Sequence, residues 1–482
     1  MKQIYIAIRG QDWLYRLAGL TSGLFLGIPA IYPALVPLQL VAFLPVFYLA
    51  AMEKTSSLGM LVAGLYMGLA YTMPQLFILR LPVPMSVLLL VWLTIIMIAI
   101  AWASKKLLQN NGVPGAFAVG ALLVTTDWIN FTALPIWGTA QSLVRPWSRY
   151  PDLIQFVSFT GITGILFVFG SIQALAAQFA FNPKIRLKSI AAISVITLII
   201  LSANVVVQSQ KPVGRLKVAA VGWKIDDSKK LGEIYSETGF EKLLADPIAD
   251  AAEKGARLIV CPEGVLWFSQ GQRQDWLEKL AGITQKHNIF LAIGCIDTTN
   301  DKNKMMFISP SGEPVGEYTK THLTFFENFN KGDGQPTLIA IDGYAAGAMI
   351  CQDDNFIDLS RKYGQMGISV VAVPTWDWFE VKDAHLQNSI YRAIESRYAI
   401  VRAALNGISA IVSPDGRVLA EKDHFKQGPG FIMAEVPLYS TLTLFSYFGH
   451  WPIVPAVIFL IIYSVSRFKG SLRKIRLIRF KE

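Results

Sequence analysis

Residues 347–356 read GAMICQDDNF, a small apolar run that ends in a cysteine and is followed by a cluster of polar side chains. Apolar runs of this kind predict a strand that is buried on both faces. The chain contains three cysteines, Cys261, Cys295 and Cys351, without a CxxC pair, so neither a disulfide framework nor a zinc site is indicated. Cys351 is therefore a candidate reactive thiol at the end of a buried strand.

Comparable apolar runs lie on both sides of this stretch and alternate with helical patterns, an order that predicts an α/β domain. The predicted strands are LKVAAVGW, RLIVCPE, IFLAIGCID, GAMIC and GISVVAVPT. Helices are expected near residues 237–254, 272–287 and 384–398. Reactive groups in such open sheets stand on the loops that follow the strand ends.

Three of these strand ends carry residues suited to acyl transfer. Glu263 ends RLIVCPE, Cys351 ends GAMIC, and GEYTKTHLTFFENF holds Lys320 and Glu327. A thiolate nucleophile needs a base, for which Glu263 is a candidate. The ammonium of Lys320, held by Glu327, and the backbone amides after Cys351 would stabilise an oxyanion. The same residues have structural explanations: Cys351 as a core residue, Glu263 as a turn cap, and Lys320 in a surface ion pair. Spacing alone therefore leaves the catalytic and the structural interpretations open.

Other residues with possible chemistry give weaker signals. Cys261 and Cys295 lie within apolar strands and are expected in the core. The five histidines show no metal-ligand spacing, and there is no nucleotide motif, so we expect neither a metal nor a cofactor. Asp127, in the apolar segment LLVTTDWINF, is either functional or paired with a polar neighbour.

Much of the chain is too apolar for a purely soluble protein, since 53% of its 482 residues are hydrophobic and 16% are charged. Apolar segments of bilayer length recur near residues 13–31, 33–51, 58–79, 84–104, 114–134, 152–180 and 189–207, with an eighth near 444–465. The predicted organisation is seven spans in residues 1–209, a soluble α/β domain in residues 210–440, and an eighth span with a basic tail in residues 441–482.

Glycines repeat at four-residue spacing inside two of the predicted spans. They are Gly19, Gly23 and Gly27 in the first, and Gly64 and Gly68 in the third. Small residues at this spacing favour close packing between membrane helices and carry no chemistry of their own.

The net charge of +10 is expected to reflect basic cytoplasmic loops rather than nucleic-acid binding. One set of loops carries Lys2, Arg9, Arg16, Lys54, Lys105, Lys106, Lys184, Arg186 and Lys188. The opposite set has only Arg80, Arg145 and Arg149, while the tail SRFKGSLRKIRLIRFKE adds seven basic residues. This asymmetry predicts that both termini are cytoplasmic and that the α/β domain lies on the outer, periplasmic face of the plasma membrane.

The motifs CPEG, YTKTHL and MICQD, in this order, resemble the Glu, Lys and Cys motifs of the nitrilase (carbon-nitrogen hydrolase) superfamily. VVAVPTWDWF and the following HLQNSIYRAIESRYAIVRAALNGISAIVSPDGRV add to this resemblance. With spans before and after the domain, and with WGTAQSLVRPWSRYPDLIQFVSFTGITGILFVFGSIQALAA, nearly the whole chain resembles the bacterial apolipoprotein N-acyltransferase family. The resemblance implies a polytopic α-helical membrane domain joined to an α-β-β-α sandwich.

By motif, the resemblance implies that Glu263 is the general base, Lys320 the oxyanion stabiliser and Cys351 the nucleophile. Glu327 would be the second carboxylate, which supports Lys320. Cys351 would take an acyl chain from a membrane phospholipid and pass it to the α-amine of a lipoprotein's diacylglyceryl cysteine. The implied partners are the phospholipid donor, the diacylated lipoprotein acceptor and the bilayer of the bacterial plasma membrane, without a cofactor or nucleic acid.

Aromatic loops near these motifs are expected either to dip into the membrane interface beside the substrate or to pack over the core of the domain. They contain Trp267, Phe268, Phe325, Phe326, Trp376, Trp378 and Phe379. Asp353, directly after the cysteine motif, is a further candidate for substrate contact.

The chain departs from the family pattern in three places. Gln352 and Asp353 stand where the family has Tyr-Glu. The segment THLTFFE lacks the family's Pro-Phe-Gly-Glu pattern, which brings Glu327 one residue closer to Lys320. The segment VAAVGWKIDD lacks the family's Gln-Asn-Ile. These changes predict a divergent member with another acceptor amine or donor lipid. A membrane-tethered amidase, in which water resolves the thioester, and a non-catalytic membrane protein remain the alternatives. The sequence also leaves the acyl position and the oligomeric state open.

Overall fold

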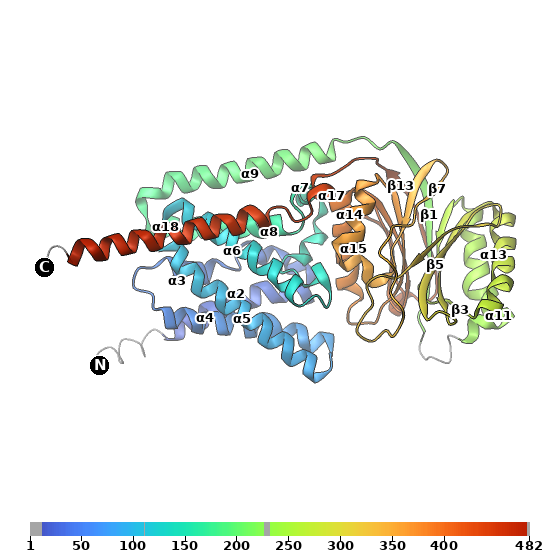
Figure 1. Ribbon diagram of the computed structural model, residues 1–482, viewed down its shortest axis with the longest axis horizontal. Helices are drawn as coiled ribbons and strands as arrows, with labels where there is room; N and C mark the ends of the chain where they lie inside the picture. Colours follow the sequence, from blue (N-terminus) through green and yellow to red (C-terminus); the bar gives the residue numbers. More distant parts are fainter. Residues whose placement is uncertain (1–11, 110, 226–231, 480–482) are drawn as a thin grey trace.

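The computed structural model describes residues 12–109, 111–225 and 232–479. Three parts follow one another along the chain (Figure 1): a helical region of residues 12–208, an α/β domain of residues 214–438, and a C-terminal segment of residues 444–479 that returns along the helical region. Several residues used for the sequence predictions lie outside the described residues or have undescribed side chains: Lys2, Arg9, Asp226, Asp227 and the basic residues of the tail.

Seven segments of the helical region are long and apolar enough to cross a membrane, as the hydropathy pattern predicts. They are α2 Asp12–Ile31, Pro33–Ala51 (η1 Pro33–Leu40 with α3 Leu44–Ala51), α4 Ser57–Leu79, α5 Val83–Leu108, α6 Gly112–Ala133, α8 Thr163–Phe181, and Pro183–Gln208 (η5 Pro183–Ile185 with α9 Arg186–Gln208). Between α6 and α8 lie four short elements: η2 Gly138–Gln141, η3 Arg145–Arg149, η4 Pro151–Leu153 and α7 Val157–Thr160.

Prolines and a glycine interrupt two of the predicted spans. The second is a 3-10 helix followed by an α-helix, because Pro37 and Pro45 lack the backbone N–H that a continuous helix needs. The sixth begins at Thr163 rather than near residue 152, because Gly161 has a left-handed φ of 69° that ends α7. The short elements before Thr163 instead pack against the α/β domain.

The predicted eighth span is divided in two. A left-handed Gly449, with φ of 59°, separates α17 Leu444–Phe448 from α18 Ile453–Arg479. The apolar part of α18, Ile453–Ser466, is shorter than the seven segments before it. An eighth membrane crossing therefore stays a prediction, although α18 runs beside the helical region (Figure 1) and contacts α6.

The repeated glycines bring helices of the helical region into backbone contact, as predicted. A Cβ atom at Gly23 of α2 would lie 2.3 Å from the carbonyl oxygen of Met67 on α4. A Cβ atom at Gly64 of α4 would lie 2.5 Å from the Cα of Ile98 on α5. Asp127 accepts hydrogen bonds from the Ser142 hydroxyl at 2.6 Å and the Leu143 amide at 3.2 Å, so it is paired with polar neighbours.

Two β-sheets stack face to face at the centre of the α/β domain (Figure 1). The first has the order β13-β1-β2-β4-β5-β6, with β3 paired to β4, and the second has the order β12-β11-β10-β9-β8-β7. The strands of the first are β1 Gly214–Gly222, β2 Leu258–Val260, β3 Leu266–Phe268, β4 Phe290–Asp297, β5 Lys302–Ile308, β6 Pro314–Thr319 and β13 Gly430–Leu438. Those of the second are β7 Ile339–Ile341, β8 Tyr344–Ala348, β9 Val370–Trp376, β10 Ala399–Leu405, β11 Ile408–Val412 and β12 Val418–Asp423.

Helices cover the outer faces of both sheets, which confirms the predicted α-β-β-α sandwich. Those outside the first sheet are α11 Glu237–Phe240, the π-helical η7 Glu241–Ala245, α12 Asp246–Glu253 and α13 Arg273–His287; those outside the second are α14 Ile357–Gln365 and α15 Lys382–Ser396. Short elements connect them: η6 Gly232–Tyr235, η8 Gln270–Gln272, η9 Cys351–Asn355 and α16 His424–Gln427. Helix α15 is buried along most of its length because it lies between the second sheet and the short elements of the helical region (Figure 1).

Candidate active site

Cys351 occupies a sharp turn between β8 and the 3-10 helix η9. Its backbone has a left-handed φ of 47°, a conformation that costs energy for a residue with a side chain and that clusters at functional sites. The neighbouring strand β9 ends beside it, and the thiol donates to the carbonyl oxygen of Trp376 at 3.5 Å. The side chain therefore lies just beyond a strand end, where the sequence predicts it.

Lys320 is buried with two carboxylates on its ammonium group. Its Nζ donates to Glu263 Oε1 at 2.7 Å and to Glu327 Oε1 at 2.8 Å. Only 1% of the Lys320 side chain is exposed, so the pairing is not a surface ion pair. Asn303 on β5, which the sequence patterns did not single out, donates to Glu263 Oε1 at 2.7 Å and to Glu327 Oε1 at 3.2 Å.

The backbone of one residue, Trp376, links this group to the thiol. The backbone N–H of Trp376 donates to Glu263 Oε2 at 2.8 Å, while its carbonyl accepts from Cys351. The structure thus brings all four predicted residues, Glu263, Lys320, Glu327 and Cys351, to one side of the domain.

The electrostatics of the group leave the sulfur protonated and the lysine charged. Burial and the Glu263 carboxylate raise the pKa of the Cys351 thiol well above its usual value, against the effect of Lys320. Burial likewise raises the pKa of Glu263, while Lys320 lowers it. Burial opposes the Lys320 ammonium, but the two carboxylates raise the pKa of Lys320 above its usual range. A thiol beside a carboxylate of raised pKa is an arrangement in which a proton can move from sulfur to oxygen as the sulfur attacks.

Asp353, the predicted substrate contact, is buried and ties two loops together. Its carboxylate accepts from the backbone amides of Ile350 at 3.1 Å and His322 at 2.8 Å, and from the Tyr318 hydroxyl at 2.8 Å. These bonds hold the cysteine turn against the loop after Lys320. The geometry favours a supporting role for Asp353 over contact with substrate.

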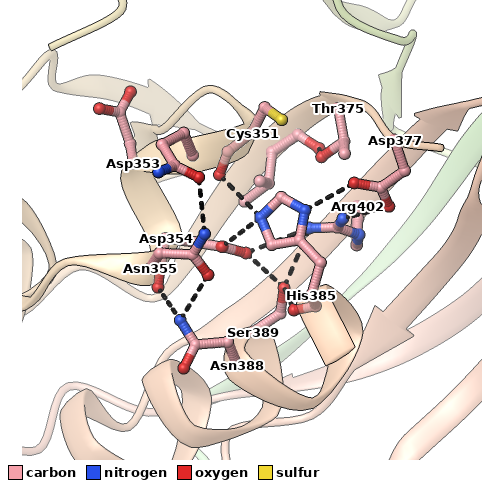
Figure 2. A network of polar contacts seen from close by, with 12 residues as sticks. Cys351, Asp353, Asp354, Asn355, Thr375, Asp377, His385, Asn388, Ser389 and Arg402 are labelled. Atoms are coloured by element: carbon pink, nitrogen blue, oxygen red, sulfur yellow. Dashed lines mark hydrogen bonds and ion pairs between the residues drawn. The ribbon is translucent and has the colours of Figure 1, made fainter. Parts of the chain in front are cut away.

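A fully buried ion network lies behind the cysteine turn (Figure 2). His385 stands between two carboxylates, with Nδ1 at 2.6 Å from Asp377 Oδ1 and Nε2 at 2.8 Å from Asp354 Oδ1. The guanidinium of Arg402 contacts the other oxygens of the same carboxylates, at 3.2 Å for Asp354 and 2.7 Å for Asp377. His385 Nε2 also lies 3.1 Å from the backbone carbonyl oxygen of Cys351, so the network supports the backbone of the proposed nucleophile.

The network is neutral in total when His385 is protonated. Burial and Arg402 oppose the imidazolium, but Asp354 and Asp377 outweigh them and raise the pKa of His385 to about 9. Cys351, Asp377 and His385 present potential ligand atoms within 4.8 Å of one another. Both ring nitrogens of His385 face carboxylates and so carry hydrogens, which leaves no lone pair for a cation.

The turn after Cys351 is fastened to the helical region. Gln352 Nε2 donates to the carbonyl oxygen of Ile136 at 2.7 Å, and Thr139 Oγ1 donates to that of Asn355 at 3.1 Å. A cavity of about 70 Å³ beside the thiol has walls from both parts of the molecule. Cys351, Asp377, Trp378 and His385 come from the α/β domain, and Leu79, Trp137, Ala140 and Arg145 come from the helical region.

The predicted aromatic residues divide between surface and core. Phe326 is 61% exposed and Phe325 is 54% exposed, and Phe326 makes an edge contact with the half-buried Trp378 at 6.3 Å between ring centroids. Trp267, Trp376 and Phe379 are also exposed, whereas Phe268 packs in the core of the domain. Cys261 and Cys295 are fully buried in the same core, as expected.

Sequence reasoning missed Asn303, His385, Arg402 and Arg145. The residues that meet around His385 come from η9, β9, α15 and β10, and no motif spacing connects them. The polar residues spread along HLQNSIYRAIES, of which His385, Asn388, Ser389 and Arg392 are buried, were the available signal, but they do not specify partners. Arg145 enters the sequence pattern only as one of the basic residues in the loops between predicted spans.

Comparison with known proteins finds similar domains and similar whole chains. Residues 217–442 match the carbon-nitrogen hydrolase family. The chain is 25% identical over 315 residues to an apolipoprotein N-acyltransferase of Geobacter metallireducens, a match that covers 56% of this chain and 59% of that relative. It is 23% identical to the Agrobacterium fabrum apolipoprotein N-acyltransferase, with 72% of each chain covered, and 24% identical to the Shewanella oneidensis protein of that name, with 69% and 70% covered.

Among solved structures, an amidase from Nesterenkonia has a TM-score of 0.39 and 20% identity, covering 47% of this chain and 92% of that one.

Proposed function

Since residues 217–442 are a carbon-nitrogen hydrolase domain and the chain resembles apolipoprotein N-acyltransferases, we propose that this protein transfers an acyl chain from a membrane phospholipid to the amino terminus of diacylglyceryl-cysteine lipoproteins. The observation that carries the proposal is the cavity at Cys351, because part of its wall, at Leu79, Trp137, Ala140 and Arg145, comes from a region with seven helices apolar enough to cross a membrane. An amidase for soluble substrates has no need of such walls.

In the first step, Glu263 takes the thiol proton as the sulfur of Cys351 attacks the ester carbonyl of the phospholipid. The Lys320 ammonium stabilises the oxyanion that forms on the carbonyl oxygen. The carbon–oxygen bond to glycerol then breaks, and the proton on Glu263 passes to the leaving oxygen. The products are a lysophospholipid and an acyl thioester on Cys351.

In the second step, the free α-amine of the lipoprotein attacks the thioester carbonyl. Glu263 takes a proton from the amine as the new bond forms, and Lys320 again stabilises the oxyanion. The carbon–sulfur bond breaks and the thiolate recovers a proton, leaving an amide on the lipoprotein. Glu327 and Asn303 hold Lys320 and Glu263 in place through both steps, consistent with their contacts of 2.8 Å and 2.7 Å.

To test this function, purified protein is incubated with phospholipid and a synthetic diacylglyceryl-cysteine peptide, and the mass of the peptide is followed. We expect a gain of one acyl chain, which Cys351→Ala abolishes. Cys261→Ala is the matched control because that thiol lies in the core, and it should retain transfer. If lysophospholipid or free fatty acid appeared without a gain in peptide mass, the acceptor would be water or another amine rather than the lipoprotein.

The proposal also requires the α/β domain to lie on the outer face of the plasma membrane. A single cysteine placed at exposed Lys286, in a variant whose other cysteines are replaced, should react with a membrane-impermeant maleimide in spheroplasts. Protection of this cysteine until the membrane is permeabilised would place the domain in the cytoplasm and contradict the lipoprotein function.

A further inference from the structure

Arg145 stands on the helical-region side of the cavity at Cys351 without an acidic partner. It begins η3, its Nε donates to Gln387 Oε1 at 3.0 Å, and its Nη1 donates to the carbonyl oxygen of Ala140. Among residues 12–109, 111–225 and 232–479, no carboxylate forms an ion pair with it. Arg402, in contrast, is buried against both Asp354 and Asp377.

A partly buried guanidinium without a counterion is costly, because the desolvation of the charge is not offset by an opposite charge. Burial lowers the pKa of Arg145, but an arginine remains charged in proteins. An anionic group in the neighbouring cavity would remove this cost.

A second cavity, of about 60 Å³, also borders Arg145. It shares Leu79, Trp137, Ala140 and Arg145 with the cavity at Cys351. Its remaining apolar walls include Leu26 of α2, Leu76 of α4, and Leu89 and Leu93 of α5. The two cavities therefore adjoin at Arg145, one of them lined by the thiol and the other by membrane-length helices.

Two further polar groups at the second cavity lack partners in the described part of the chain. Neither the amide nitrogen nor the amide oxygen of Gln141 makes a hydrogen bond, although both atoms are buried. The hydroxyl of Thr72, on α4, is likewise buried and unbonded. Both residues line the cavity that Arg145 borders, so three polar groups there are available to a ligand.

We propose that Arg145, with the amide of Gln141, binds the phosphate of the donor phospholipid, so that the first few carbons of a hydrocarbon chain of the same lipid occupy the leucine-lined cavity and its ester reaches Cys351. This inference rests on the proposed function and names the part of the donor that the protein recognises. A guanidinium matches the oxygens of a phosphate with parallel hydrogen bonds. Free phosphate would leave the apolar cavity beside Arg145 unfilled, which favours a lipid headgroup.

The test compares two acyl donors with the same chain: phosphatidylglycerol, and a p-nitrophenyl ester that has no phosphate. Arg145→Gln should lower kcat/KM for lysophospholipid release by about 10- to 100-fold, the loss expected for a charge-assisted hydrogen bond. Turnover of the p-nitrophenyl ester, which needs Cys351 but no phosphate site, should stay within about twofold. Arg149→Gln is the matched control, because Arg149 ends the same 3-10 helix and is exposed. It should leave both donors unchanged.

The outcomes separate this inference from the proposed function. Equal losses with both donors in Arg145→Gln would show that Arg145 only supports the fold, and unchanged release of lysophospholipid would show that it does not bind the headgroup. Strong inhibition of the wild-type protein by inorganic phosphate would indicate a site for a free oxyanion instead. Failure of the wild-type protein to release lysophospholipid at all would overturn the proposed function itself.

Discussion

At the scale of single residues, Cys351 lies between two charged groups with different tasks. Lys320 is held by its two carboxylates in one group, while the His385 network contacts the backbone of the cysteine turn. A left-handed cysteine persists only where its surroundings hold it in place. The bond from His385 to the Cys351 carbonyl and the bond that the Ile350 amide donates to the Asp353 carboxylate provide this restraint.

Glu263→Gln should slow the acylation of Cys351 by about 100- to 10,000-fold, the range for loss of a general base. The amide keeps an oxygen that can accept from Trp376 or Asn303, and Lys320 keeps Glu327, so the fold should survive. Acylation is measured by mass spectrometry of the intact protein after rapid mixing with donor lipid. Glu317→Gln, at a partly exposed carboxylate on β6, is the control. An acylation rate within threefold of wild type in Glu263→Gln would assign the proton transfer to another group.

The His385 network predicts a loss of stability in alkali. Because the pKa of His385 is raised from 6.5 to about 9, its contribution is fully present below pH 6.5 and is lost as the pH rises through 9. This rise in pKa corresponds to a contribution of about 3 kcal/mol to the free energy of unfolding. The apparent Tm of the wild-type protein in detergent should therefore fall between pH 6.5 and pH 9.5.

His385→Asn is expected to be less stable at pH 6.5 and to show a weaker dependence on pH. His322, whose pKa is also raised to about 9, is present in both proteins, so the difference between the two curves reports His385. Parallel curves would mean that His385 is neutral in the folded protein.

At the scale of elements, the helical region depends on close contacts at its glycines, and the α/β domain contains glycines that make none. Gly23→Val should destabilise the protein by about 1–3 kcal/mol or more, because the side chain would collide with the backbone of α4. Gly282, inside α13, has open space around it. Gly282→Ala should therefore stabilise the folded protein by about 0.5–1 kcal/mol. Apparent Tm values of the two variants in one detergent give the comparison; a neutral Gly23→Val would mean that α2 and α4 can separate without cost.

Sequence patterns predict the elements well where one local property decides them. Hydropathy identifies the seven apolar helices, and β-branched runs identify β1, β4 and β9. The breaks at Gly161 and Gly449 are harder to predict, because a glycine ends a helix only if the chain also turns there. The three motifs give Glu263, Lys320 and Cys351, but Asn303 and Arg145 owe their positions to tertiary contacts that no local pattern records.

At the scale of the whole molecule, α15 joins the two parts. One face packs on the second sheet, and the other reaches the helical region, where Tyr391 Oη donates to the Val144 carbonyl at 2.7 Å and Glu395 accepts from the Ile162 amide at 3.0 Å. Burial raises the pKa of Glu395 to about 7, with Arg392 acting against the rise. Separation of the parts would expose these groups together with apolar surface.

Residues 210–440 expressed alone should accordingly be aggregation-prone, because the outer face of α15 would be exposed to water. Size-exclusion chromatography and sedimentation after expression at low temperature measure the soluble fraction. The full chain in detergent is the reference, and it should elute as a single species. A soluble, monomeric fragment would show that the helical region is not needed to cover α15.

The bonds from Gln352 to Ile136 and from Thr139 to Asn355 have a geometric consequence for the protein in a bilayer. They tie the turn that bears the sulfur to the segment between α6 and α8, two membrane-length helices that the hydrocarbon layer would hold at a fixed depth. The height of the sulfur above the ester plane of the lipids is thus a property of the membrane as much as of the protein. Bilayers with shorter acyl chains would lower that plane, and bilayers with longer acyl chains would raise it, relative to a sulfur that the helices hold in place.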